Sequence, residues 1–264
     1  MSKSHRNAFH SGQIPLDEST IRRQADAMVS TGLFAAGYHY INIDDLWATG
    51  RDQNGTIVAS ASRFPSGMAA LATYLHSKGL SFGLYTDVGT KTCGGSPGSF
   101  GHECQDARTF AEWGVDWLKE DHCNVPHTNM SLDTFYHVSL TKMAKCLNNT
   151  GRPILFDLCA HGCYDIINGV NQKHNASCWQ QWYQYAQATG NTWRTTTDIQ
   201  VRGDGMWNSV LRNWYRNDAF QDVLPLAQVW WWLDHCPRQF VGPHFIYDSV
   251  LDGEIARCHL WMGK

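Results

Sequence analysis

The sequence lacks the features that would identify a membrane-spanning, nucleotide-binding or zinc-finger protein. No apolar run approaches the ~18 residues that a spanning helix needs, and the most apolar tract, VWWWL at 229–233, is far too short. No G-x-G-x-x-G follows a predicted strand and no G-x-x-x-x-G-K-[ST] is present, so a doubly wound nucleotide-binding protein is not supported. No pair of cysteines has the C-x-x-C spacing of common zinc sites.

Charge is also sparse, because only 17% of the 264 residues are charged and the net charge is −3. This balance predicts no binding to nucleic acid and none to an anionic membrane surface. The length is enough for one large α/β domain or two small ones. The opening MSKSHRNAFHSG has no apolar segment, so no signal peptide is expected.

Cysteines and glycosylation motifs, by contrast, are frequent. The chain has nine cysteines and four N-x-[ST] sequons, which begin at Asn54, Asn129, Asn148 and Asn175. Together they favour a secretory-pathway protein with some disulfides, whereas in the cytosol the cysteines would be free thiols. The absent signal peptide conflicts with this interpretation, and we take the conflict to indicate an incomplete gene product.

Helical and strand patterns alternate along the chain, which predicts βαβ units and a parallel sheet. The predicted strands are 38–45, 80–87, 115–121, 152–158 and 193–199. One helix is predicted to start at Asp17, and a second to start at 65–67 and end at 78–79. Three more are predicted to cover about 104–113, 131–147 and 206–216.

Aspartates end four of the predicted strands: Asp45, Asp87, Asp121 and Asp198. In a (β/α)8 barrel the carboxyl ends of the strands surround one active site, whereas an open sheet concentrates its polar residues near one switch point. The repeated aspartates therefore favour the α/β class with a (β/α)8 TIM barrel.

The stretch GVDWLKEDHC, 114–123, runs a strand into charged residues. Lys119 and Asp121 are two residues apart and should face the same side, where the lysine would lower the pKa of the aspartate and keep it ionised. Asp198 follows a drier WRTTT segment, which would raise its pKa towards an acid's role. Such a pair is the minimum for glycoside hydrolysis, although structural ion pairs perturb carboxylates as often. Glu120 and His122 should point the other way and are predicted to be structural.

Four long segments in the right order resemble the α-galactosidase (melibiase) family of retaining glycoside hydrolases, which also contains α-N-acetylgalactosaminidases. They are YHYINIDDLW, FGLYTDVGTKTCGG, GHECQDARTFAEWGVDWLKEDHC and WRTTTDI. The resemblance implies a (β/α)8 barrel, release of terminal α-linked galactose from small or oligosaccharide galactosides, and no metal or organic cofactor. It also implies a secreted or lysosome/vacuole-like setting, with a homodimer as one compatible assembly.

The resemblance assigns roles residue by residue. Asp121 would be the nucleophile and Asp198 the general acid/base. A second group would bind the sugar or lie in the substrate site, namely Asp44, Asp45, Tyr85, Lys119 and Arg194. Cys93 and Cys123 would form a disulfide beside the site. Each assignment has a plainer alternative, such as a strand-end turn for the aspartates, core packing for Tyr85 and two free thiols for the cysteines.

Departures from the family pattern limit these expectations. The family's first strand should precede residue 7, Ala160 replaces a glutamate that favours galactose, and 163–190 has the character of an insertion. The motif N-D-P-D-M is not found, and only 254–261 matches a late helix. Residues 1–264 are thus predicted to be a partial barrel, lacking its first and last strands and the C-terminal β-domain. The alternatives are α-N-acetylgalactosaminidase specificity and an inactive member that only binds galactosides.

Overall fold

The computed structural model describes residues 15–159, 176–194, 207–208, 210–211 and 258–262. Within these ranges helices and parallel strands alternate as the sequence predicted. The helices are α2 (Glu18–Ser30), α3 (Met68–Ser77), α4 (Glu103–Glu112), α5 (Leu132–Asn148) and α6 (Ala176–Thr189). The strands are β1 (Tyr38–Ile43), β2 (Ala48–Arg51), β3 (Ile57–Ala59), β4 (Ser81–Asp87), β5 (Trp117–Asp121), β6 (Leu155–Leu158), β7 (Thr192–Trp193) and β8 (Cys258–Met262).

Local sequence signals account for the helix starts and for their buried faces. The side chain of Asp17 caps α2 by accepting a hydrogen bond from the backbone N–H of Thr20 at 2.8 Å. In α3 the four predicted apolar positions are all buried, at Met68, Leu71, Ala72 and Leu75. An apolar stripe of this spacing covers one side of a helix and requires a partner surface, which the sheet supplies.

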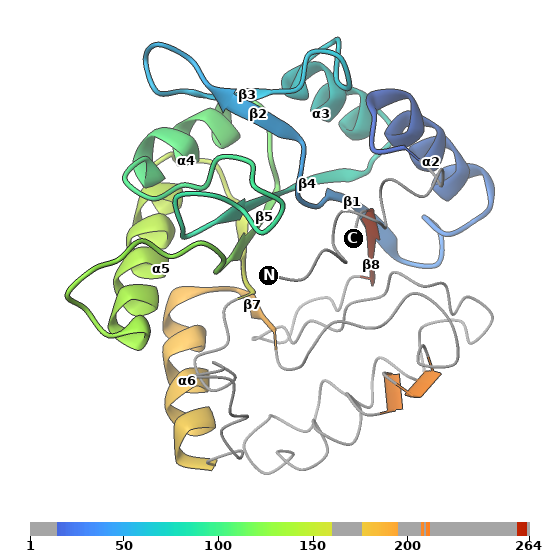
Figure 1. Ribbon diagram of the computed structural model, residues 1–264. Coiled ribbons are helices and arrows are strands. Elements are labelled where there is room, and N and C mark those ends of the chain that lie inside the picture. Colours follow the sequence, from blue (N-terminus) through green and yellow to red (C-terminus); the bar gives the residue numbers. More distant parts are fainter. Residues whose placement is uncertain (1–14, 160–175, 195–206, 209, 212–257, 263–264) are drawn as a thin grey trace.

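Six strands form one parallel sheet in the order β7-β6-β5-β4-β1-β8. Figure 1 shows α2, α3, α4, α5 and α6 following one another in an arc around these strands. A doubly wound sheet would carry helices on both faces, whereas a barrel carries them only outside. The curled sheet with its outer arc of helices is therefore an incomplete (β/α)8 barrel, as predicted.

The two faces of the sheet have different contents. Leu84 and Leu118 belong to the large core between the strands and the helices, while Tyr40 and Trp117 form a separate small cluster. Because side chains alternate along a strand, Trp117, Lys119 and Asp121 share this second, inner face. The inner face is thus apolar towards the amino ends of the strands and charged at their carboxyl ends.

One prediction about secondary structure was wrong, and one segment contains a helix that was not predicted. The unpredicted helix is α6, which lies within the segment 163–190. The predicted late helix at 254–261 is replaced over 258–261 by β8, which pairs in parallel with β1, with Tyr40 opposite His259. Helix and strand compete for so short an apolar segment, and the free edge of β1 supplies hydrogen-bond partners that only a strand can use.

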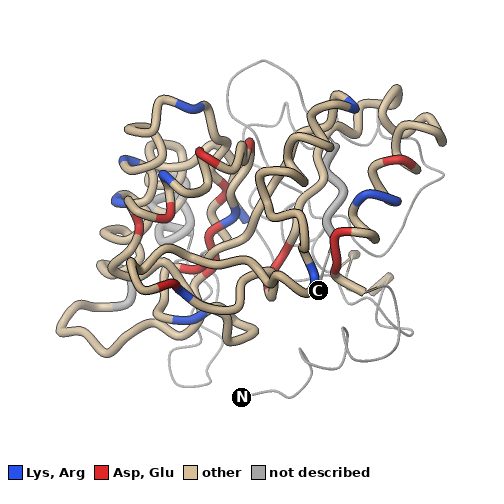
Figure 2. The backbone as a smooth tube through the Cα atoms, turned by 90° about the horizontal axis from the view of Figure 1, so that it is seen from above, with Lys and Arg blue, Asp and Glu red and all other residues tan. Residues whose placement is uncertain are grey.

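A hairpin of β2 and β3, which the sequence reading did not single out, follows β1. Residues 195–199 of the last predicted strand lie outside the described part, as does most of the helix expected at 206–216. No helix among the described residues has both the length and the apolar character to cross a membrane. Figure 2 shows basic and acidic positions interspersed along the backbone instead of separated into regions of one sign.

Candidate active site

The carboxyl ends of three neighbouring strands bring aspartates together. Asp44 and Asp45 directly follow β1, Asp87 is the last residue of β4, and Asp121 is the last residue of β5. The strand register places Asp87 opposite Asp121, and all four side chains are buried. The predicted gathering of strand-end aspartates is therefore confirmed for the three strands described.

Lys119 lies on the inner face, as predicted, but its ion partner is Asp44. Its Nζ is 3.2 Å from Asp44 Oδ2, and both side chains are almost inaccessible to solvent. Burial alone would lower the pKa of Lys119, but the carboxylates around it, with Asp44 first, outweigh this effect and raise that pKa. The ammonium also lies 5.1 Å from the centre of the Tyr85 ring. Lys119 is thus a fixed positive charge in the floor of the site.

Hydrogen bonds orient the carboxylate of Asp121. The hydroxyl of Tyr85 donates to Oδ2 at 2.9 Å, and the backbone N–H of His122 donates to Oδ1 at 2.9 Å. Burial, reinforced by the charge of Asp121, raises the pKa of Tyr85 well above its ordinary value, so the hydroxyl keeps its proton. Tyr85 therefore acts on the carboxylate itself and is more than a wall of the site.

The ring of His122 packs edge-on against Tyr136 of α5, with ring centroids 5.5 Å apart, so it turns towards the helices outside the sheet, as predicted. Its Nδ1 lies 3.2 Å from Asp121 Oδ1. Glu120 also points to the outer face, as predicted.

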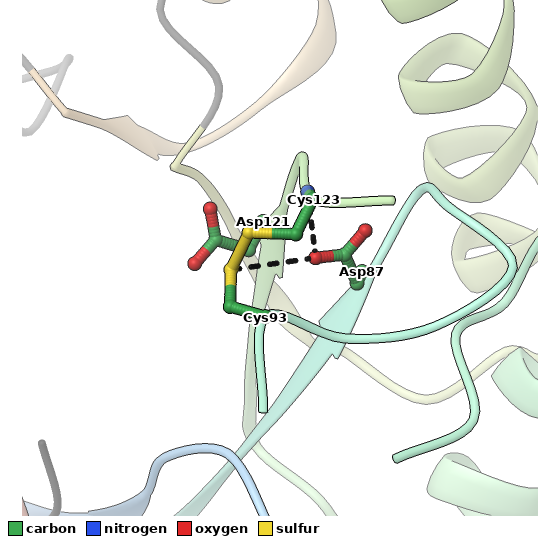
Figure 3. A group of neighbouring side chains, drawn as sticks. All are labelled: Asp87, Cys93, Asp121 and Cys123. Atoms are coloured by element: carbon green, nitrogen blue, oxygen red, sulfur yellow. Dashed lines mark hydrogen bonds between the residues drawn. A yellow bond between two sulfur atoms is a disulfide. The ribbon is translucent and has the colours of Figure 1, made fainter. Parts of the chain in front are cut away.

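The disulfide between Cys93 and Cys123 is present, with Cα atoms 5.0 Å apart. It links the loop after β4 to the end of β5. Figure 3 shows Asp87 and Asp121 flanking its sulfur atoms, and Asp87 Oδ2 accepts the backbone N–H of Cys123 at 2.9 Å. Asp45 holds the same loop, because its Oδ2 accepts the N–H of Gly94 at 2.6 Å. Burial raises the pKa of Asp45, against these hydrogen bonds.

Two further carboxylates of the site were not among the predicted site residues. Asp87 ends its strand, which the sequence did indicate, and it is completely buried. Asp157 lies on β6 opposite Lys119 and accepts a hydrogen bond from Thr192 Oγ1 at 2.7 Å. Burial raises the pKa of Asp157 to about 6, although Thr192 and Lys119 oppose that shift. Asp157 lies two residues before Cys159, in the loop predicted to follow this strand. That position near the carboxyl end of a strand was the signal that could have identified it.

The remaining predicted residues lie at the edge of the described part. Arg194 follows β7, its backbone N–H donates to Leu158 O at 2.9 Å, and its Nη1 lies 3.5 Å from Cys159 Sγ. Asp198 and Ala160 lie outside the described residues, so the separation of the two predicted catalytic carboxylates stays a prediction. A second disulfide, Cys104–Cys146, joins α4 to α5 and was not predicted.

This arrangement suits chemistry on a neutral polyhydroxylated ligand. An oriented carboxylate at a strand end can attack carbon, and a neighbouring ammonium–carboxylate pair can bind hydroxyl groups. A metal could be held in one place among the described residues, by Asp87, Cys93, Asp121 and Cys123, whose ligand atoms lie within 4.8 Å of one another. While the disulfide persists, its sulfurs are not thiolate ligands.

Comparison with known proteins gives one consistent result. The family described as Alpha galactosidase A matches residues 8–248. An alpha-galactosidase of Coffea arabica is 47% identical over 206 residues, which cover 77% of this chain and 48% of that protein. The chain thus spans about half the length of the curated relatives it matches.

Solved structures agree with the sequence comparison. A putative alpha-galactosidase/melibiase from Bacteroides fragilis is 35% identical with a TM-score of 0.66, over 79% of this chain and 41% of that one. The alpha-galactosidase of Saccharomyces cerevisiae solved with raffinose is 33% identical with a TM-score of 0.61, over 72% of this chain and 39% of that one.

Proposed function

Because the chain belongs to the alpha galactosidase A family, we propose that it supplies the nucleophile of a hydrolase that releases terminal α-linked galactose with retention of configuration. The observation that carries the proposal is the oriented carboxylate of Asp121 at the end of β5. Tyr85 hydrogen-bonds that carboxylate, and the buried Lys119–Asp44 pair lies next to it on the inner face.

In this mechanism Asp121 attacks the anomeric carbon of galactose while Asp198 protonates the leaving oxygen. The galactosyl–enzyme ester is then cleaved by a water molecule that Asp198, now ionised, deprotonates. Retention follows from two inversions and requires the two carboxyl groups to lie about 5–5.5 Å apart. Lys119, Asp44, Asp45 and Arg194 are proposed to bind sugar hydroxyls, since charged groups form the stronger hydrogen bonds.

The substrate class is a small or oligosaccharide galactoside. The Saccharomyces cerevisiae relative solved with raffinose supports this class. One sequence observation favours a second candidate, α-N-acetylgalactosaminidase activity, because the small Ala160 would leave room for an acetamido group. A secreted or lysosome/vacuole-like setting is supported by the two disulfides, since such bonds persist in oxidising compartments. The homodimer and the domain limits, 1–264, stay predictions.

The test is turnover of an aryl α-galactoside and of its N-acetylgalactosaminide by the chain made in a secretory host. Asp121→Asn should lower kcat by about 10³-fold or more, because it removes the nucleophile while preserving shape. Asp26→Asn is the matched control, since Asp26 lies on the exposed face of α2. Turnover that survives Asp121→Asn would refute the proposal, and so would inactivity of folded parent protein towards both substrates.

A further inference from the structure

Four side chains with metal-ligating atoms lie together at the ends of β4 and β5. The sulfurs of Cys93 and Cys123 and one carboxylate oxygen each of Asp87 and Asp121 lie within 4.8 Å of one another. Figure 3 shows the carboxylates on either side of the sulfurs, which form a disulfide. We propose that, once a thiol reductant opens this disulfide, the two thiolates and two carboxylates bind one thiophilic divalent cation such as Zn²⁺.

The four ligands match the chemistry of Zn²⁺, which takes four thiolate, imidazole or carboxylate ligands in a tetrahedron. Zinc–sulfur and zinc–oxygen bonds of about 2.3 Å and 2.0–2.2 Å place neighbouring ligand atoms roughly 3.4–3.8 Å apart. Cys93 Sγ already lies 3.9 Å from Asp87 Oδ2. This pair of atoms is therefore already close to the separation of two ligands of one zinc ion.

Contacts other than the disulfide keep the two cysteines close. The side-chain amide of Asn124, next to Cys123, donates to the carbonyl of Thr92, next to Cys93, at 2.8 Å. The backbone N–H of Thr90 donates to the carbonyl of Asn124 at 3.2 Å. Gly89 packs so closely that a Cβ there would overlap the carbonyl oxygen of Cys123. Because these contacts tie both loops together, reduction should leave a preformed pair of thiols.

Hydrogen bonds also orient the carboxylates, as the outer contacts of metal ligands commonly do. Asp87 accepts the backbone N–H groups of Gly89 at 2.7 Å and of Cys123 at 2.9 Å. Tyr85 and the N–H of His122 fix Asp121. Within the ranges that the structure describes, Asp87 makes no ion pair, so a bound cation would supply the positive charge that two adjacent buried carboxylates require.

The redox step is a thiol–disulfide exchange. Two molecules of a small thiol reduce the Cys93–Cys123 bond, transfer two electrons and two protons, and become a disulfide themselves. The cation then replaces the two thiol protons, which are released to solvent. One consequence rests on the proposed function: the cation would bind the carboxylate of Asp121, the proposed nucleophile, so the reduced, metal-loaded protein would be inactive.

The experiment is a titration of the reduced, oxygen-free protein with Co²⁺, followed by Zn²⁺ displacement. The expected result is one cobalt per chain with thiolate-to-cobalt charge transfer and the intense visible bands of a tetrahedral site, neither of which appears in the oxidised protein. Cys93→Ser/Cys123→Ser should abolish the signal, and Asp87→Asn should weaken the affinity by more than about tenfold. Cys104→Ser/Cys146→Ser is the matched control and should retain the signal, because that disulfide lies between α4 and α5.

Two outcomes would overturn the metal site: no thiolate–cobalt band in the reduced parent, or an unchanged band in Cys93→Ser/Cys123→Ser. Loss of the far-ultraviolet circular dichroism on reduction would overturn it as well, since the four ligands need the folded strand ends. The readout is independent of catalysis. Cobalt binding by the reduced protein, with no galactoside turnover by the oxidised protein, would refute only the proposed function. Turnover by the oxidised protein, with no cobalt binding by the reduced protein, would refute only the metal site.

Discussion

Lys119 and Asp44, 75 positions apart in the chain, form a buried ion pair with 3.2 Å between Nζ and Oδ2. Lys119 shares its face of β5 with Asp121, yet its ammonium meets a carboxylate from the end of β1. The pair therefore fixes the floor of the site across two strands that are not neighbours in the sheet.

Removing one member of the Lys119–Asp44 pair should destabilise the folded protein. We expect Lys119→Met to lower the free energy of unfolding by about 3–5 kcal/mol, because Asp44 would remain as an uncompensated buried charge. Lys119→Met/Asp44→Asn should recover much of that loss. Urea unfolding of the two single variants and the double variant measures the coupling. A Lys119→Met protein within about 0.5 kcal/mol of the parent would contradict a buried pair.

Tyr85→Phe should impair turnover while leaving the fold intact. It removes the hydroxyl that donates to Asp121, and a hydrogen bond to a charged group contributes about 1.5–3 kcal/mol, which corresponds to roughly a 10- to 150-fold loss of kcat. Tyr74→Phe is the control, because that hydroxyl bonds the exposed Asp26. Equal kinetics for Tyr85→Phe and the parent would show that this hydroxyl does not orient the nucleophile.

Glu120 should make the protein more stable at acid pH. It is completely buried, and neither carboxylate oxygen has a hydrogen-bond partner among the described residues. Burial first, and then the charges of Asp87, Glu103 and Asp106, raise its pKa well above 4.5. The folded state keeps a proton that the unfolded chain releases. The contribution of Glu120 to the free energy of unfolding is therefore complete below pH 4.5 and is lost as the pH rises through the pKa of the folded state.

The measurement for Glu120 is urea unfolding between pH 4 and pH 8. Glu120→Gln cannot ionise and should be more stable than the parent at pH 8, by about 1 kcal/mol or more, with no comparable advantage at pH 4. Glu112→Gln, on the exposed side of α4, is the control. A constant difference between Glu120→Gln and the parent across this range would mean that Glu120 is not protonated in the folded state.

Asp157 should give the site a titration near pH 6. Its pKa is raised from 3.8 to about 6, so its stabilising effect is complete below 3.8 and is lost between 3.8 and 6, a change of about 3 kcal/mol. Above pH 6 it adds a negative charge beside Lys119 and Asp121. We expect the pH profile of kcat/KM to show a step near 6 that Asp157→Asn abolishes. Profiles of the same shape for both proteins would exclude Asp157 as its source.

Periodicity predicted the elements that bury an apolar face, and the strand-end aspartates predicted where the site lies. The four buried positions of α3 were read directly from their spacing, and Asp45, Asp87 and Asp121 were recognised as strand ends. Both signals are local, since they depend on neighbours within one helix or one strand. The outward direction of His122, next to Tyr136 of α5, followed from the same strand alternation.

The sequence by itself determined the alternation of helices and strands, the inner-face position of Lys119 and Asp121, and the family to which the chain belongs. Only the tertiary structure decided that Lys119 pairs with Asp44, that Asp157 joins the site, and that Cys258–Met262 forms a strand against β1. Those contacts link segments 38 to over 200 residues apart. The alternation of side chains along a strand fixes which face of the sheet a residue is on. Only the packing of distant strands fixes which side chains it contacts on that face.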